Sequence, residues 1–159
     1  MRVANPIGVL AIWLGGRNWL PRFAPYIVKL DMFLRKLTRG RFTLLTLSGL
    51  PELFLTVPGR KSGIPRTTPL LCVPHKGGWL IAGSNWGQPK PPMWVGNLEA
   101  ADRATVGFHG RDTVVTPRLM EGAERAELFQ VMLGTWPNYT MYERKSEREL
   151  KVFWLTPAE

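Results

Sequence analysis

Hydrophobic and polar positions follow a helical period near the N-terminus and a strand-like pattern after Gly40. In residues 22–37 the apolar residues recur at spacings of three and four, which predicts an amphipathic helix with a basic polar face. Gly40, after Lys36 and Arg39, predicts its C-terminal stop. The apolar stripe consists of Phe23, Tyr26, Ile27, Leu30, Phe33, Leu34 and Leu37. We expect this stripe to pack on the core, with contact to anionic lipid as the alternative.

Short runs rich in Leu, Val, Thr and aromatic residues, separated by Gly and Pro, predict β-strands in the rest of the chain. The expected strands are residues 42–47, 52–57, 67–73, 79–83, 105–108, 113–119 and 151–155, and the expected inserted helices are residues 92–100 and 121–134. Gly77-Gly78 and Gly110-Arg111-Asp112 suit tight hairpins. The pattern therefore predicts an α+β fold in which a meander forms a small barrel or a half-open sheet. We expect a helical extension over residues 1–40 and a barrel domain over residues 41–159.

The composition is that of one globular domain: 159 residues, of which 45% are hydrophobic and 21% charged. Cys72 is the single cysteine, and the chain contains two histidines, His75 and His109. The sequence therefore excludes disulfides within the chain and Cys/His zinc sites. We expect no metal. Cys72 and His75 are three residues apart on a strand and point to opposite faces, so we interpret Cys72 as a buried structural residue, not a nucleophile. Walker, Gly-x-Gly-x-x-Gly, Gly-x-Ser-x-Gly and His-Glu-x-x-His motifs are absent from the sequence.

The net charge is concentrated in the first part of the chain. The 21 Lys and Arg against 12 Asp and Glu give 21 − 12 = +9, and residues 1–66 hold 11 of these cations but only Asp31 and Glu52. Such a field predicts an anionic partner: nucleic acid, anionic lipid or an anionic small molecule. Nucleic acid is the least favoured, because net charge alone supports it and no recognised motif does.

The N-terminal segment, residues 3–16, is uncharged but shorter than the roughly 20 residues that a membrane-spanning helix needs. It also lacks an Ala-x-Ala cleavage site, so we expect a cytoplasmic protein. The apolar residues 7–14, Trp13, Trp19 and the basic helix after them predict peripheral contact with the inner face of an anionic membrane.

Three segments carry candidate chemistry. Residues 59–69 (Gly-Arg-Lys-Ser-Gly-Ile-Pro-Arg-Thr-Thr-Pro) combine flexible glycines with three cations, which suits phosphate or carboxylate, although a solvated hairpin is the alternative. In residues 83–97, small residues at a strand end would let a flat ring approach the backbone, unless the segment is a Pro-rich loop with its tryptophans in the core. Trp136, Tyr139 and Tyr142 recur every three residues and form either a pocket wall or part of the core.

In this order the three segments resemble the deazaflavin-dependent nitroreductase family, which binds coenzyme F420 in a split β-barrel of FMN-binding-like fold. The motifs that carry the resemblance are Gly-Arg-Lys-Ser-Gly-Ile-Pro-Arg, Gly-Gly-Trp-Leu-Ile-Ala-Gly-Ser, Pro-Met-Trp and Trp-Pro-Asn-Tyr-Thr-Met-Tyr, within residues 53–157. The resemblance implies an F420H2-dependent reductase that transfers hydride to a small hydrophobic acceptor: a quinone, an enone or a nitroaromatic. The alternative is a non-catalytic protein that stores F420 or a flavin such as FMN.

The resemblance also assigns residues to the site. The implied coenzyme-binding residues are Gly59, Arg60, Lys61, Ser62, Arg66, Thr68, Pro69, Gly83, Ser84, Asn85, Trp86, Gly87, Pro92, Met93, Trp94 and Asn97, with Arg60, Lys61 and Arg66 on the anionic tail. The implied acceptor-binding residues are Trp136, Tyr139 and Tyr142, and the candidate catalytic residues are Ser84, Tyr139 and Tyr142. Family members commonly read Ser-Lys-Gly-Gly where this chain has Ser84-Asn85-Trp86-Gly87, and Tyr where it has Trp136. These departures predict a reshaped acceptor pocket.

Overall fold

The computed structural model of this chain describes residues 6–159, apart from the side chain of Leu45. Its strands are β1 (Glu52–Pro58), β2 (Pro65–Leu71), β3 (Val73–His75), β4 (Gly78–Ala82), β5 (Ala104–Phe108), β6 (Arg111–Leu119) and β7 (Val152–Pro157). Its helices are α1 (Pro6–Gly15), the 3-10 turn η1 (Leu20–Phe23), α2 (Ala24–Thr38), α3 (Leu44–Leu47), the 3-10 turn η2 (Asn85–Gly87), α4 (Met93–Glu99), α5 (Gly122–Leu133) and α6 (Asn138–Ser146).

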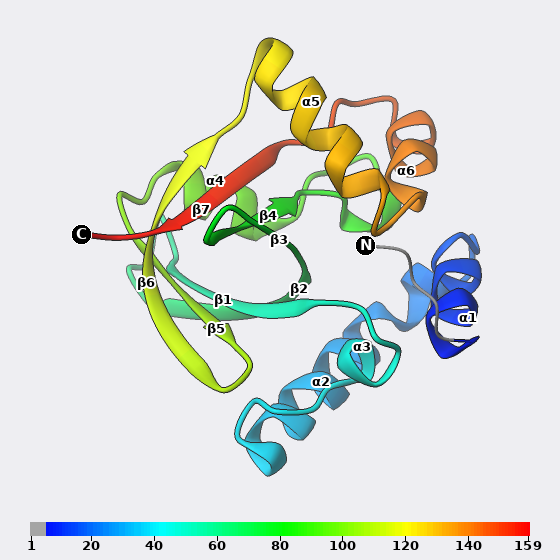
Figure 1. The fold of residues 1–159 in the computed structure, drawn as a ribbon, viewed down its shortest axis with the longest axis horizontal. Helices are drawn as coiled ribbons and strands as arrows, with labels where there is room; N and C mark the ends of the chain where they lie inside the picture. Colours follow the sequence, from blue (N-terminus) through cyan, green and yellow to red (C-terminus); the bar gives the residue numbers. More distant parts are fainter. Residues whose placement is uncertain (1–5) are drawn as a thin grey trace.

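The strands form one antiparallel sheet in the order β2-β1-β5-β6-β7-β4-β3. β2 and β3 are its opposite edges, yet Cys72 alone separates them in the chain. One residue spans less than 4 Å, so the sheet has to curl until its two edges meet. The result is the half-closed barrel of Figure 1, which confirms the predicted α+β split-barrel fold.

The sheet is not the simple meander that the strand spacing suggested. β7, from the C-terminus, lies between β6 and β4, and β1 pairs with β5 although three strands, β2 to β4, separate them in the chain. The two predicted hairpins are present, but each turn begins one residue earlier than expected. Lys76-Gly77 and His109-Gly110 have positive φ at both positions, as two-residue hairpin turns with this twist require.

The predicted strand over residues 42–47 is wrong, because this segment contains the short helix α3. Thr43 initiates it: the backbone N–H of Thr46 donates to the Thr43 hydroxyl (3.3 Å), and the backbone N–H of Thr43 donates to the Thr46 hydroxyl (2.6 Å). Such side-chain capping satisfies backbone groups that a helix start leaves open, and it outweighs the strand propensity of a short Leu-rich run.

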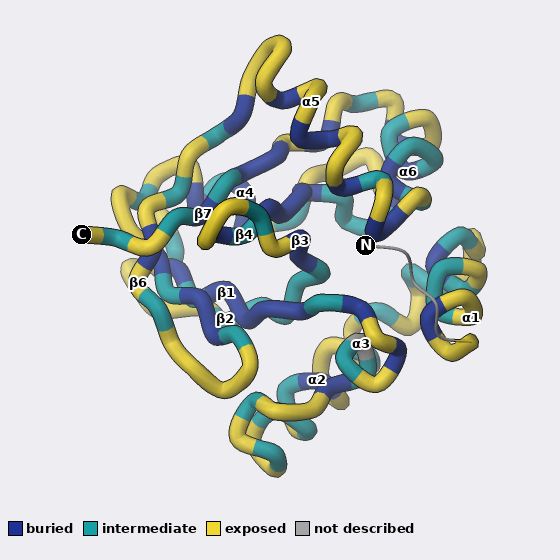
Figure 2. The backbone as a smooth tube through the Cα atoms, viewed as in Figure 1, coloured by how far each residue is buried: buried dark blue, intermediate teal, exposed yellow. Residues whose placement is uncertain are grey.

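Two groups of buried residues form the core. Alternate residues of β1, with Val106, Phe153 and α4, fill the barrel, while α5, α6 and β4 enclose the second group. In Figure 2 the strands β1, β4 and β7 are largely buried, whereas α1 and α2 are mostly exposed or intermediate. Cys72 is fully buried between the two sheet edges and burial raises the pKa of its thiol, which confirms its structural role.

The apolar stripe of α2 does not pack on the barrel as predicted. Tyr26, Phe33 and Leu37 are exposed to 69%, 60% and 68%, and the α2 residue that is buried is Asp31. Its carboxylate accepts a hydrogen bond from the backbone N–H of Leu44 (2.9 Å). Helical periodicity identifies an amphipathic helix but not which face the sheet will accept.

Asp31 gives the protein a pH-dependent stability. Burial raises the pKa of the Asp31 carboxyl, which hydrogen bonds to the carboxyl of Glu52. A raised pKa means that the folded state holds this proton more tightly than the unfolded chain, so the contribution to stability is present at about pH 4 and is lost as the pH rises. We expect Asp31→Asn to raise the unfolding temperature at pH 8 more than at pH 4. Thermal unfolding of the wild type and of Asp31→Asn at pH 4 and pH 8 measures this difference. An equal rise in unfolding temperature at both pH values would contradict the raised pKa of Asp31.

Candidate active site

The turn between β1 and β2, residues 59–64, presents cations on a compact backbone. The N–H of Gly59 donates to the carbonyl of Ile64 (2.9 Å), and the N–H of Gly63 donates to the carbonyl of Gly59 (2.8 Å). Gly63 has a φ of +68°, which a residue with a side chain would adopt only under strain. The turn therefore holds Lys61 and Ser62 at an exposed tip.

Arg60 leaves this tip and lies against α4. Its backbone N–H and its Nη1 both donate to Oδ1 of Asn97, at 3.1 and 3.3 Å. A Cβ on Gly96 would lie 2.6 Å from Nη1 of Arg60, so the guanidinium rests directly on the glycine. Asn97 is buried, and the bidentate contact fixes where the charge of Arg60 lies.

Arg66 lies on the face of the sheet against which α4 packs. It pairs with Val57 on β1, and directly paired residues share a face. Val57 packs in the barrel core with Trp94, Val95 and Leu98 of α4. Within residues 6–159, Arg60, Lys61 and Arg66 form no ion pair. Three cations without acidic partners near one turn are a favourable environment for an anion.

The segment after β4, residues 83–87, also packs against α4. A Cβ on Gly83 would lie 2.6 Å from Cγ2 of Val95, so glycine is needed for this close approach. Asn85, Trp86 and Gly87 then have φ values of 43°, 56° and 76°. Trp86 is bulky, and such a residue at positive φ costs of order 1 kcal/mol or more, a form of strain that concentrates at functional sites. Asn85 secures the segment by donating its Nδ2 to the carbonyl of Lys90 (2.8 Å).

Arg148 holds this segment and was not predicted from the sequence. It donates Nη1 to the carbonyl of Gly83 (2.9 Å), Nη2 to that of Ser84 (3.0 Å) and Nε to that of Gln88 (3.3 Å). Burial lowers the pKa of its guanidinium, which nevertheless stays charged at neutral pH. Sixty or more residues separate these partners, so no local pattern in the sequence could have indicated the contact.

We expect Arg148→Ala to loosen residues 83–88 and to lower kcat/KM about tenfold, because small misplacements of a site are costly. Arg148→Lys is the matched control for charge, since a lysine cannot donate to three carbonyls in a fixed plane. Steady-state kinetics of both variants separates the effect of the hydrogen-bond geometry of Arg148 from the effect of its charge. If the lysine variant is as active as wild type, the fork of hydrogen bonds has no positioning role.

The aromatic triplet contacts the same segment at Gly87. A Cβ on Gly87 would lie 3.1 Å from both Cα and Cδ1 of Tyr142, so η2 and α6 are in direct contact. Trp136, Tyr139 and Tyr142 are all buried, with exposures of 6%, 2% and 3%. Burial raises the pKa of Tyr139 well above its usual range and that of Tyr142 to about 12. Both hydroxyls are therefore neutral at physiological pH.

Helix α1 covers the triplet, a contact that the sequence analysis did not predict. The Tyr142 hydroxyl donates to the carbonyl of Gly15 (2.7 Å), and Nδ2 of Asn138 donates to the carbonyl of Ile12 (2.6 Å). A Cβ on Gly15 would lie 2.3 Å from Cζ2 of Trp136. The consecutive glycines at 15 and 16 are the one signal in the sequence that could have indicated so close an approach.

The predicted residues thus form one continuous chain of contacts from the cationic turn through α4 and residues 83–87 to α6. Pro92 precedes α4 and touches Gly83, Trp94 and Asn97 are buried in α4, and Met93 is exposed at its start. Thr68 and Pro69 lie in β2, on opposite faces of that strand. Within the described part of the chain, His, Cys, Asp and Glu form no group that could hold a metal ion.

The comparisons with known proteins point to one family. A protein-family model described as F420H(2)-dependent quinone reductase matches residues 32–157. The chain is 28% identical over 143 residues to the F420H(2)-dependent quinone reductase MT1299 of Mycobacterium tuberculosis (strain CDC 1551 / Oshkosh), covering 87% of this chain and 96% of that protein.

Among solved structures, an F420-H2 dependent reductase (FDR-A) is 31% identical, with a TM-score of 0.61 over 66% of this chain and 93% of its own. The heme storage protein HutZ from Vibrio cholerae aligns over 82% of this chain and 91% of its own at 11% identity, with a TM-score of 0.52. At that identity the likeness shows the fold alone.

Proposed function

The chain belongs to the F420H2-dependent quinone reductase family and is an oxidoreductase whose hydride donor is F420H2, and we propose that the residues around α4 form its active site. The observation that supports this most is the continuous contact from Arg60 through Asn97, Gly83 and Gly87 to Tyr142. Family membership favours the reductase over the non-catalytic store and the nucleic-acid module considered above.

Arg60, Lys61 and Arg66 hold the anionic tail of the coenzyme in this proposal. Their charges fit a polyanion, because the described residues offer them no ion pair and Arg60 is already oriented by Asn97. The exposed tip at Lys61 and Ser62 leaves room for a long tail. Arginine forks suit both carboxylate and phosphate groups.

Residues 83–87, with Met93 at the start of α4, border the ring of the coenzyme. The bound coenzyme supplies the hydride. The protein supplies a strained, rigidly held backbone: Arg148 fixes its carbonyls and Gly87 fixes it to α6. A segment held in this way is preorganised before the ligand arrives, so less binding free energy is lost in ordering it.

The acceptor lies against the partly exposed residues 84–86, and the buried aromatic triplet supports this segment from behind through the contact of Tyr142 with Gly87. A quinone becomes a quinol by taking up one hydride and one proton. Ser84 is partly exposed, so its hydroxyl is placed to donate a hydrogen bond to the acceptor oxygen and to relay a proton from water. The buried hydroxyls of Tyr139 and Tyr142 stay protonated, and these side chains act as a neutral support for residues 83–87 instead of touching the acceptor.

Turnover tests the proposal. Catalytic amounts of the protein should accelerate the oxidation of F420H2 by a water-soluble quinone. The return of F420 absorbance measures this oxidation. Binding without turnover would identify a storage protein and overturn the proposal. Ser84→Ala should lower kcat by a larger factor than it weakens coenzyme binding, and an unaltered kcat would remove Ser84 from the mechanism.

We also propose that α1 and α2 hold the protein peripherally on an anionic membrane, where a hydrophobic quinone would be dissolved. Within residues 6–159 no helix is long and apolar enough to cross a membrane. However, Leu10 and Trp13 of α1 are exposed, as is the stripe of α2, and Figure 1 shows both helices outside the sheet on one side of the molecule. Arg17 and Lys29 add the charge that attracts an anionic surface.

Sedimentation with anionic liposomes tests this contact. We expect the double variant Leu10→Ser/Trp13→Ser to bind vesicles at least tenfold more weakly. Apolar side chains of this size that are half inserted into the bilayer each contribute about 1 kcal/mol or more to binding. Val114→Ser, which removes an exposed valine on β6, is the matched control and should bind like wild type. If the wild-type protein stays in the supernatant at low salt, the membrane proposal fails.

A further inference from the structure

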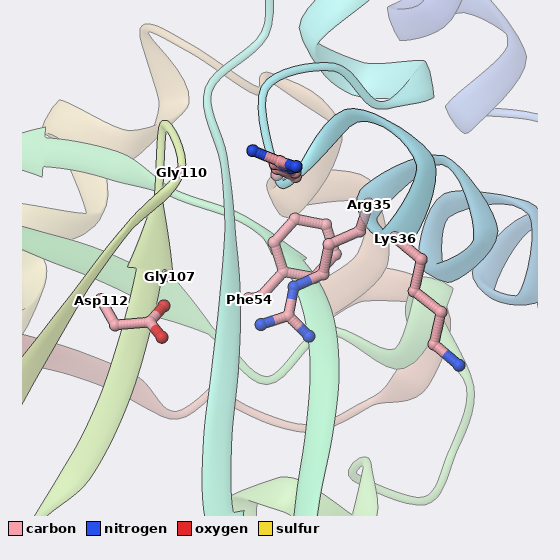
Figure 3. A pocket seen from close by; sticks show the side chains of 8 residues that line it. Arg35, Lys36, Phe54, Gly107, Gly110 and Asp112 are labelled. Atoms are coloured by element: carbon pink, nitrogen blue, oxygen red, sulfur yellow. The ribbon is translucent and has the colours of Figure 1, made fainter.

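A second cationic pocket lies between the end of α2 and the β5–β6 hairpin, apart from the site described above. Its volume is about 270 Å³. Figure 3 shows Arg35 and Lys36 extending from α2 and Asp112 approaching from β6 on the other side. The lining residues are Arg35, Lys36, Arg39, Gly40, Phe54, Gly107, Gly110 and Asp112. We propose that this pocket binds a small hydroxylated phosphate compound.

The pocket lies on the face of the sheet opposite to the barrel core. Phe54 lies between Leu53 and Leu55, whose side chains pack inside the barrel, so its own ring points outward toward α2. The cationic turn at Arg60, by contrast, rests on α4, which packs against the inner face. The two basic sites are therefore separate, and the pocket does not depend on the proposed active site.

The charges in the pocket favour an anion. Arg35, Lys36 and Arg39 line it against the single carboxylate of Asp112, and none of the three cations has an ion pair in residues 6–159. Arg35 lies in the last turn of α2 and Arg39 is the C-cap of this helix, with a φ of 55°, so two guanidinium groups line the same pocket. A bound anion would offset the excess of positive charge that lines the pocket.

The backbone keeps the pocket open. A Cβ on Gly107 would lie 3.1 Å from Oδ1 of Asp112 and 3.8 Å from Nη2 of Arg35, so any side chain there would fill the floor. Gly40 and Gly110, both with φ near +80°, bring the helix end and the hairpin together: a Cβ on Gly40 would lie 3.3 Å from Cα of Gly110. The guanidinium of Arg35 stacks on Phe54, with 4.8 Å from Cζ to the ring centroid.

These features define the chemistry of the ligand. A stacked guanidinium keeps its N–H groups in plane for a phosphate, Arg39 adds a second guanidinium, and Lys36 adds a compact point charge. Asp112 would repel a second anionic group but accepts hydrogen bonds from a hydroxyl. The volume is smaller than the 300 Å³ or more of typical drug-sized sites, which favours a phosphate on a short polyol over a nucleotide. A free metabolite and a lipid headgroup share this chemistry.

Calorimetry or NMR that measures the binding of glycerol phosphate to the full chain tests the inference. We expect a Kd at or below about 1 mM, and Lys36→Gln/Arg39→Gln should weaken binding at least tenfold. Lys29→Gln, on α2 but outside the pocket, is the control for net charge and should have little effect. Arg60→Ala should bind as wild type does, which keeps this result independent of the proposed function.

Two further probes identify the ligand class. Asp112→Asn should lower the affinity for glycerol phosphate relative to that for inorganic phosphate, because glycerol phosphate brings alcohol hydroxyls that donate to the carboxylate, while the loss of negative charge acts on both anions alike. Phosphatidylglycerol vesicles that compete with glycerol phosphate would indicate a lipid headgroup, and no competition would indicate a soluble metabolite. Absence of glycerol phosphate binding at about 10 mM, or an equal loss in Lys29→Gln, would overturn the proposal.

Discussion

Replacing Arg60 by alanine is expected to weaken F420 binding about 10- to 100-fold. A charge-assisted hydrogen bond to a phosphate or carboxylate is worth about 1.5–3 kcal/mol, and each 1.4 kcal/mol is a factor of ten in Kd. The bidentate contact with Asn97 means that Arg60 is oriented before the ligand arrives. Lys61→Ala should cost less, because its side chain lies at the exposed tip of the turn. Fluorescence titration with F420 at two salt concentrations measures both effects, and added salt should shrink the difference from wild type.

Gly96→Ala gives an independent test without touching a charge. The new Cβ would lie 2.6 Å from Nη1 of Arg60, so the guanidinium has to move while the helix α4 stays intact. Alanine in a helix interior is more stable than glycine by about 1 kcal/mol, so the variant should unfold at the same or a higher temperature and yet bind F420 more weakly. Undiminished affinity in both Arg60→Ala and Gly96→Ala would show that the turn is a solvated hairpin.

Local sequence patterns predicted most elements of this fold because the information was local. The period of residues 22–37 and of residues 121–134 gave the helices α2 and α5, and alternating runs gave most strands. The order of the strands could not be predicted from local patterns, because β7 pairs with β4 and β6, which are distant from it in the chain. The burial of Asp31 could not be predicted either, because a periodic stripe does not say which face will be covered.

The candidate site was predicted through motifs, but the contacts that hold it together were not. Nothing near Arg148 in the sequence indicates the carbonyls of residues 83–88, and nothing in residues 136–142 indicates that a helix from the N-terminus covers them. Polar side chains that act over such distances have no periodic signal. They can be found from strained backbone, such as Trp86 at positive φ, once coordinates show which donors surround it.

The contact between α1 and the aromatic triplet yields the second large effect, through Gly15→Ala. Its Cβ would lie 2.3 and 2.6 Å from two ring atoms of Trp136, and a buried ring is not a flexible end that can swing away. Either Trp136 shifts or α1 undocks and loses the hydrogen bonds from Tyr142 and Asn138. Gly16→Ala is the matched control, because its Cβ would have 3.5 Å to the nearest atom, an ordinary contact.

We expect Gly15→Ala to raise the KM for the quinone about tenfold or more while the Kd for F420 stays the same, since a displacement of about 1 Å in the support behind a substrate site is costly. The split follows from the geometry: α1 touches the triplet, whereas the cationic turn touches α4. Hydrogen exchange over residues 6–15 should also rise in Gly15→Ala but not in Gly16→Ala, because the docked helix protects its own amides. If the two alanine variants share one KM and one exchange rate, α1 is a passive cover and the acceptor lies elsewhere; if Gly15→Ala weakens F420 as well, the coenzyme and α1 occupy the same space.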